Sequence, residues 1–257
     1  MMTVDEMSYE FDVLASSYLH EHGFGKSDST MLAFNEYEKS VYLTREQENL
    51  VLALYSDSSS IGSFERTEQL RRDLDNLLDE RVLDAWNEDK THITNGTQFF
   101  RLADLTDGGS YSNLNLWFIV YEAARYSTDG WDNTDCPIDE SDFPVEVVPI
   151  TYDTFHRIKG NPFRGPNRRR ALRLDNGKDV SNYVEILSKY PLGKYYVKYI
   201  RRPRPIILTD LGDGLTINGE STKSSCELHD SLHRLILDGA VRMAISSRVG
   251  PVKEEKN

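Results

Sequence analysis

The residues of this sequence that could hold a metal ion lie close together near its C-terminal end. The segment CELHDSLHR contains Cys226, His229 and His233, and the two histidines are one helical turn apart. Side chains at this spacing can bind a divalent metal on one face of a helix. A closed site needs a fourth ligand, and the strongest candidate, Cys136, lies far away in an acidic segment. We therefore interpret the histidines as surface residues of a helix and predict no metal and no cofactor.

Carboxylates gather in the segment TDGWDNTDCPIDESD, residues 128–142. Six Asp and Glu residues in this stretch could in principle bind Ca²⁺. The segment lacks the ligand order of an EF-hand, and a hydrolytic pair of acids is defined by geometry rather than by number. We interpret the segment as a solvated acidic loop. A hydrolase that uses these acids with a divalent ion remains an alternative, which calorimetry with Ca²⁺, Mg²⁺ and Mn²⁺ would test.

Sequence motifs of nucleophilic catalysis and nucleotide binding are absent: there is no G-x-S-x-G, no P-loop and no G-x-G-x-x-G. No apolar run approaches 18 residues, and the acidic N-terminus lacks the pattern of a signal peptide. With only two cysteines, we expect free thiols and synthesis in a reducing cytoplasm. The sequence therefore predicts a protein that is not an enzyme and has no membrane partner.

A basic segment, RIKGNPFRGPNRRRALRLD at 157–175, contains seven Lys and Arg in a chain whose net charge is −12. Its Gly and Pro residues exclude a helix, so the basic side chains are expected on a loop that runs into a strand. A second basic cluster, KYIRRPRP at 198–205, ends another strand, and the two form one patch if those strands are neighbours. The residues predicted to interact are Arg157, Lys159, Arg164, Arg168, Arg169, Arg170, Arg201, Arg202 and Arg204.

Three roles are open for these basic residues. They could form a solvated sheet edge that resists further strand pairing. A nucleic-acid-binding protein could use the basic strands around 164–173 and 198–204, although the overall negative charge repels a polyanion elsewhere. They could also form a seam with the acidic helices of a neighbouring copy. The division of charge favours the seam, because residues 1–150 carry 30 Asp and Glu against 10 Lys and Arg, whereas residues 151–257 carry 12 against 20.

Helical periodicity dominates the first 90 residues. Thr3 and Glu6 form a capping box, and apolar residues recur behind them on one helix face. The segment TREQ at 44–47 predicts a second capping box. The segment FERTEQLRRDLDNLLDERVLDAW at 64–86 predicts a third helix with a leucine stripe.

The middle of the chain is rich in β-branched and aromatic residues separated by turn signals. It predicts mostly antiparallel strands at 97–104, 114–126, 143–150, 168–175, 181–188 and 194–203, with a short helical turn at 151–160. A last helix carries the stripe Leu228, Leu232, Leu235, Ile236, Ala240 and Met243.

The predicted fold class is therefore α+β, with an N-terminal helical part, an antiparallel β-sheet middle and a C-terminal helix. The helical region spans 1–90. The β region spans 91–220 and includes the acidic loop 128–142 and the basic loop 157–173. The C-terminal helix and a charged tail span 221–257.

Several segments, taken in order, resemble a known family. They are FNEYEKSVYLTREQENLVLALY, FERTEQLRRDLDNLL, YDTFHRIKGNPFRGPNRRRALRLD, YYVKYIRRPRPIIL and CELHDSLHRLILDGAVRMA. This succession is similar to virion structural proteins of crAss-like and related podovirus-type tailed phages. Members of that family form neck rings, the head-to-tail connectors between portal and tail. The resemblance covers roughly residues 34–246.

The resemblance implies a homo-oligomeric ring of twelve copies stacked on the portal. Its expected partners are other copies of the chain, the portal protein and adjacent neck or tail proteins. Genomic DNA would pass through the lumen without sequence-specific binding. The implied location is the virion neck, after synthesis in the cytoplasm of the bacterial host, with no catalysis and no cofactor. A head-to-tail ring joins two different faces of one subunit, and opposite charges on those faces favour that pairing.

Overall fold

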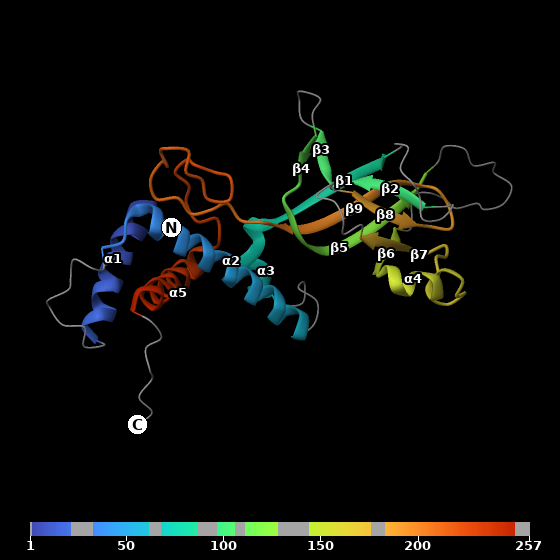
Figure 1. The fold of residues 1–257 in the computed structure, drawn as a ribbon. Helices are drawn as coiled ribbons and strands as arrows, with labels where there is room; N and C mark the ends of the chain where they lie inside the picture. The colour runs from blue at the N-terminus through green and yellow to red at the C-terminus, as the bar shows by residue number, and fades with distance from the viewer. Residues whose placement is uncertain are drawn as a thin grey trace. The chain divides into compact units, whose positions relative to one another are not determined.

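A computed structural model of the chain describes residues 2–21, 33–61, 68–86, 97–105, 111–127, 144–175 and 183–249 (Figure 1). The chain divides into two compact units. The helical unit comprises Met1–Leu77 and Arg202–Asn257, and the barrel unit comprises Leu78–Arg201. The barrel unit is thus an insertion in the chain of the helical unit. The three regions 1–90, 91–220 and 221–257 stay a prediction, because they divide the sequence by residue pattern rather than by contacts.

The helical unit begins with the capping box that the sequence predicts. Glu6 N donates to Thr3 Oγ1 (3.3 Å) and Thr3 N donates to Glu6 Oε2 (2.7 Å), so two backbone groups at the helix start are satisfied. The apolar face behind the cap is buried, with Met7 and Phe11 almost fully enclosed. The helices of this unit are α1 (Val4–Glu21), α2 (Glu36–Ile61), α3 (Glu68–Leu74), the 3-10 helix η3 (Asp75–Leu77) and α5 (Asp230–Val249).

The second predicted capping box, at 44–47, is wrong. Helix α2 starts eight residues earlier, where Asn35 Oδ1 accepts from Glu38 N (2.7 Å) and Glu38 Oε2 accepts from Asn35 N (3.0 Å). Thr44 and Gln47 lie inside α2 and are buried. The polar side chains of Thr44 and Gln47 do not cap a helix start; they form hydrogen bonds with backbone groups of another segment.

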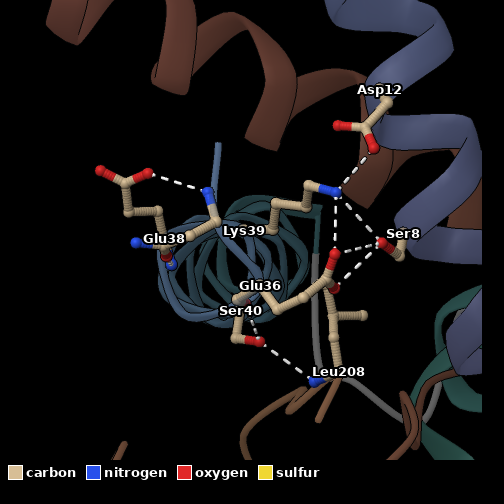
Figure 2. A network of polar contacts seen from close by, with 8 residues as sticks. Ser8, Asp12, Glu36, Glu38, Lys39, Ser40 and Leu208 are labelled. Carbon is tan, nitrogen blue, oxygen red and sulfur yellow. Dashed lines mark hydrogen bonds and ion pairs between the residues drawn. The ribbon is translucent and has the colours of Figure 1, made fainter. Parts of the chain in front are cut away.

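That other segment is the extended stretch 204–208, which lies along α2. Thr44 Oγ1 accepts from Ile206 N (3.0 Å) and donates to Ile206 O (3.3 Å), and Gln47 Nε2 donates to Arg204 O (2.8 Å). One turn earlier, Ser40 Oγ accepts from Leu208 N (3.0 Å), as Figure 2 shows. Side chains of one helix face therefore replace a neighbouring strand as the hydrogen-bond partner of this segment. We call this set of contacts the α2 ladder.

Helix α5 confirms the predicted C-terminal helix and packs against α2 and α1. Gly239 lies in its middle, and a Cβ there would collide with the side chain of Glu46 of α2. Leu235, predicted as part of the buried stripe, is exposed. The buried apolar residues of α5 are Leu232, Ile236, Leu237, Ala240, Val241, Ala244 and Ile245.

The barrel unit is a closed sheet in the order β1-β2-β8-β7-β6-β5-β9. Six of its pairings are antiparallel, and β6 with β7 is parallel. A closed ring of seven strands cannot alternate direction all the way round, so one parallel pair is required. Helix α4 (Tyr152–Lys159) connects that pair, as a parallel connection needs. The barrel strands are β1 (Leu78–Trp86), β2 (Thr97–Arg101), β5 (Leu116–Tyr126), β6 (Val145–Ile150), β7 (Arg170–Asp175), β8 (Tyr183–Leu187) and β9 (Leu192–Arg201). A separate two-stranded sheet is formed by β3 (Ala103–Leu105) and β4 (Tyr111–Asn113).

The predicted fold class is therefore wrong in its architecture, although both helices and strands are present. The β part is a closed barrel rather than an antiparallel sheet, and the last helix belongs to the same unit as the first helices. Barrel closure depends on pairings between strands far apart in the sequence, such as β1 with β9 and β2 with β8. Local residue patterns predict strands but not these partners.

The third predicted helix is also wrong over its second half. Helix α3 ends at Leu74, and residues 78–86 form strand β1, which pairs with β9 from Leu78↔Ile200 to Asp84↔Lys194. Leu, Glu and Arg are good helix formers, but helix propensity is a weak determinant, and this long ladder overrides the local preference.

The barrel interior is mostly apolar but encloses one ion pair. Arg173 alternates with Leu172 and Leu174, which pack outward against Phe155 of α4. Its Nη1 therefore lies inside the barrel, 3.2 Å from Glu122 Oε1. Tyr195 donates its hydroxyl hydrogen to Glu122 Oε2 (2.8 Å). Burial raises the pKa of Tyr195 well above its usual value, and the Glu122 carboxylate adds to the rise, so the hydroxyl stays protonated.

Candidate functional site

The predicted basic loop 157–173 lies on the barrel unit, but it begins inside α4 and ends inside β7, so only its central part is a loop. Five of its basic side chains are exposed: Arg157 and Lys159 in the last turn of α4, and Arg164, Arg168 and Arg169 in the loop that follows. Arg170 is half-buried at the start of β7, 3.7 Å from Glu146 Oε2 of the parallel neighbour β6. Five of the nine predicted residues are thus gathered on one exposed stretch, and the sixth anchors its end.

The loop is held by its own hydrogen bonds. Asn161 Oδ1 accepts from Phe163 N (2.9 Å) and Arg164 N (3.2 Å), which is an Asx-type turn. Gly165 N then donates to Asn161 O (2.7 Å). A Cβ at Gly165 would lie 2.6 Å from that carbonyl oxygen, so only glycine permits this close approach. Asn167 closes a second tight turn, with mutual backbone hydrogen bonds to Arg170.

The neighbouring structure fixes the loop from both sides. Tyr126, at the end of β5, donates its hydroxyl to Asn167 O (3.2 Å) and Arg168 O (3.1 Å). From β7, Arg170 Nη1 donates to Phe163 O (3.4 Å). Because turns, a strand and a guanidinium all hold its backbone, the loop presents its side chains in a pre-organised arrangement.

Phe163 is the functional candidate that sequence reasoning missed. Its side chain is 87% exposed at the tip of the loop, beside Arg164. An aromatic residue between Pro162 and Arg164 follows neither helix nor strand periodicity. A large apolar residue in a segment with no apolar period was therefore the available signal.

The second basic cluster does not join this loop within the barrel. Strands β7 and β9 are separated in the sheet by β6 and β5, so the two strands are not neighbours. Arg201 ends β9, whereas Arg202 and Arg204 belong to the helical unit. There, Arg202 Nη2 lies 2.9 Å from Glu48 Oε1, and Arg204 Nε lies 3.9 Å from Glu227 Oε1. These two arginines therefore have acidic partners within their own unit.

The interpretation of the two histidines as surface residues of a helix is wrong, because His233 is buried in α5 and His229 precedes that helix. The His233 side chain is buried, with Nε2 3.0 Å from Leu228 O, and His229 Nδ1 lies 2.9 Å from Ser231 Oγ. Burial raises the pKa of the Cys226 thiol to about 12. No group of three or more potential metal ligands occurs among the described residues.

Two further sequence predictions concern the acidic segment and membrane-spanning helices. The acidic segment 128–142 and Cys136 lie outside the described residues. None of the helices in the described ranges is both long enough and apolar enough to cross a membrane.

Comparison with known proteins identifies the family. A model of the family described as phage tail ring protein 3/4 matches residues 2–256. The chain is 39% identical over 249 residues to Ring protein 3 of Bacteroides phage crAss001, covering 96% of each chain. It is 30% identical over 262 residues to Ring protein 4/5 of the same phage, covering 98% of this chain and 96% of the relative. The match spans both units, and the chain therefore belongs to the phage tail ring protein 3/4 family.

Proposed function

We propose that this protein is a structural subunit of the virion neck, where copies of it close into a ring between the portal and the tail. The observation that carries the proposal is the end-to-end match to ring proteins, which includes both the helical and the barrel unit. A closed ring repeats one head-to-tail contact, so each subunit must offer two different complementary faces.

The charges of the two units supply such a difference. The helical unit contains 23 Asp and Glu against 14 Lys and Arg, a balance of −9. The barrel unit contains 19 against 16, and six of those acids lie in 128–142. Without that segment the balance of the barrel unit is 13 against 16, or +3. The exposed basic loop is the densest part of this positive charge, and the helical unit of a neighbouring copy is its natural partner.

The proposed ring contains twelve copies, binds the portal protein and the next neck or tail component, and surrounds the path of the DNA. Imaging of the portal vertex in the native virion, with the subunits of each ring counted, tests this assignment. A neck that lacks this chain, or a ring built from a different number of copies, would contradict the corresponding part.

A charge-reversal experiment tests the role of the loop. Replacing Arg164, Arg168 and Arg169 by Glu is expected to leave the fold intact and to abolish ring assembly, measured by mass photometry and electron microscopy. The matched control replaces three exposed basic residues of the same unit outside the loop, Arg125, Lys189 and Lys194, by Glu. Rings from the loop variant that match the wild type would remove the loop from the assembly contact.

The same variants address the nucleic-acid alternative. Duplex binding that falls steeply with salt and disappears in the loop variant, while rings persist, would favour nucleic acid as the partner of the loop. No binding at low salt would dispose of that alternative.

A further inference from the structure

The tip of the basic loop has the composition of an interface anchor. Aromatic and arginine side chains carry much of the binding energy at protein interfaces, especially where they are pre-organised. Phe163 stands out from the loop with Arg164 beside it and Arg168 five residues on, all three exposed. Single exposed apolar residues are ordinary. An exposed aromatic residue next to arginines, on a loop whose backbone is held by hydrogen bonds, is a more specific arrangement.

Helix α1 carries a second exposed apolar feature, on the side opposite to its core. Its buried face is formed by Val4, Met7, Phe11 and Ala15. Tyr9 and Val13 are 72% and 49% exposed, and their i,i+4 spacing places them side by side on the outer face.

Acidic residues flank this outer pair. Glu6 and Glu10 lie on the same helical face as Val13, because they precede it by seven and three residues, and Glu6 also lies three residues before Tyr9. Hydrogen bonds from the Thr3 backbone and hydroxyl lower the pKa of Glu6, so its carboxylate stays charged. We call Glu6, Tyr9, Glu10 and Val13 the α1 outer face.

Several other acids of the helical unit are already in ion pairs. Asp12 and Glu36 bind Lys39, Glu38 binds Arg248 and Glu48 binds Arg202. Within the described ranges, Glu10 has no ion pair of its own. The α1 outer face thus combines a carboxylate outside any ion pair with exposed apolar surface.

We propose that Phe163 of one copy packs on Tyr9 and Val13 of the next copy, with Arg164 and Arg168 facing Glu6 and Glu10. This docking rests on the proposed ring and names the two surfaces that make its repeated contact. Both surfaces have an apolar centre and a charged rim, and the rims have opposite sign, so the pairing satisfies charge and apolar burial together.

The same charges set the direction of assembly. Two basic loops repel each other, as do two α1 outer faces, so like-to-like dimers are disfavoured. Loop-to-helix contact leaves one free loop and one free helix face at the ends of every oligomer. Copies therefore add head to tail until the chain closes.

Disulfide trapping tests the contact directly, including transient encounters. A chain with Pro162→Cys and Ser17→Cys, in a Cys136→Ser background, keeps Phe163 and Tyr9 and is expected to form intermolecular disulfide-linked ladders under mild oxidation. Pro162 directly precedes Phe163, and Ser17 lies one helical turn beyond Val13 on α1; both are exposed. Cys226 can stay, because its thiol is buried and its pKa is raised to about 12. The matched control pairs Pro162→Cys with Leu235→Cys, an exposed residue of α5. The Ser17 pair should link at least about tenfold faster, which corresponds to roughly 1.4 kcal/mol of preference; equal rates overturn the docking.

Complementary variants test direction and charge. Phe163→Ala with Arg168→Glu disables the loop, and Tyr9→Ala with Glu10→Gln disables the helix face. Each is expected to be monomeric alone, whereas a mixture should yield dimers and nothing larger, because only one intact contact remains. A chain with Arg168→Glu and Glu10→Arg together should regain self-association. Circular dichroism verifies that each variant is folded.

The outcomes separate this docking from the ring itself. Normal closed rings from both disabled variants would overturn the docking and leave the proposed ring standing. Specific trapping with open oligomers but no closed rings would support the docking and contradict the ring. If virions with Phe163→Ala lose their packaged DNA while ring assembly is unchanged, the loop is assigned to nucleic-acid binding and the docking is overturned.

Discussion

The two units bury charge in different ways. In the barrel unit, Arg173 and Glu122 are both enclosed, with side chains 8% and 7% exposed. In the helical unit, Lys39 is 3% exposed, but its partners Asp12 and Glu36 are 56% and 38% exposed (Figure 2). Water can therefore solvate the acids of the helical pair if the lysine is lost, whereas the barrel acid has no such relief. Removing one partner of an ion pair is costly when both side chains are buried away from water, because the remaining charge is then left without solvation.

The largest effect is expected from breaking the barrel pair. Arg173→Met leaves the Glu122 carboxylate buried without its cation and should lower the free energy of unfolding of the barrel by about 3–5 kcal/mol. The measurement is chemical denaturation followed by β-sheet circular dichroism. The control is Arg173→Met with Glu122→Gln, which removes both charges and should recover most of the loss. A double variant as unstable as the single one would show that packing, not charge, is responsible.

The α2 ladder gives the next largest effect. Thr44→Val removes the hydroxyl that binds both Ile206 N and Ile206 O and leaves these buried groups without it. The expected loss is about 1–3 kcal/mol, measured by denaturation monitored through helical circular dichroism. Thr44→Ser keeps the hydroxyl and should lose less. Equal stabilities of Thr44→Ser and Thr44→Val would show that the hydrogen bonds of the hydroxyl do not contribute to stability.

Breaking the helical ion pair should cost less than breaking the barrel pair. Lys39→Met removes hydrogen bonds to Asp12 (2.7 Å) and Glu36 (3.0 Å), but both acids then reach water. We expect a loss of about 1 kcal/mol in thermal or chemical denaturation. A loss as large as that of Arg173→Met would contradict the contrast between dry and wet pairs.

The same pair predicts a pH dependence. Burial alone lowers the pKa of Lys39, but hydrogen bonds and charges from Asp12 and Glu36 outweigh it, so the pKa is raised from its ordinary value of 10.5. A raised pKa means that the stabilisation is complete below the pKa of the unfolded chain and is lost as pH rises through that of the folded protein. The stability difference between wild type and Lys39→Met should therefore be constant near neutral pH and shrink above about pH 10.5. A difference that shrinks between pH 6 and 8 would exclude this origin.

The smallest effect is expected at the start of α2. Asn35→Ala removes the side-chain acceptor for Glu38 N and should cost about 1 kcal/mol or less. Asn35→Asp keeps the acceptor and should be close to the wild type. Chemical denaturation followed by helical circular dichroism measures the free energy of unfolding of both variants.

Features set by local chemistry were predictable from the sequence. Five of the six predicted strands, the Thr3 cap and helix α4 follow from residue alternation, capping residues and turn signals, and these are confirmed. The predicted strand 97–104 is instead divided between β2 and β3, which belong to different sheets. The barrel was not predictable, because its closure depends on long-range pairing. Strand β1 was read as a helix because its Leu and Asp residues show no clear alternation, and its pairing with β9 decides its state.

The features of the candidate site also divide into those set by the local sequence and those set by tertiary contacts. Gly and Pro residues predicted a basic loop, and Arg164, Arg168 and Arg169 are exposed on it, although Arg157 and Lys159 lie in α4. Three other placements depend on tertiary contacts. Arg170 anchors the loop, Arg202 and Arg204 bind acids of the helical unit, and Arg173 faces the barrel interior. Phe163 could have been singled out only by treating an aromatic residue outside any periodic pattern as a signal in itself.

The chain enters the barrel at Leu78 and leaves it after Arg201, and Leu78 pairs with Ile200. Entry and exit are thus only one strand spacing apart, about 5 Å. A module whose termini meet so closely can be exchanged, enlarged or deleted during evolution without stretching the backbone that hosts it. Related chains could then diversify what the inserted module touches while the helical scaffold stays the same.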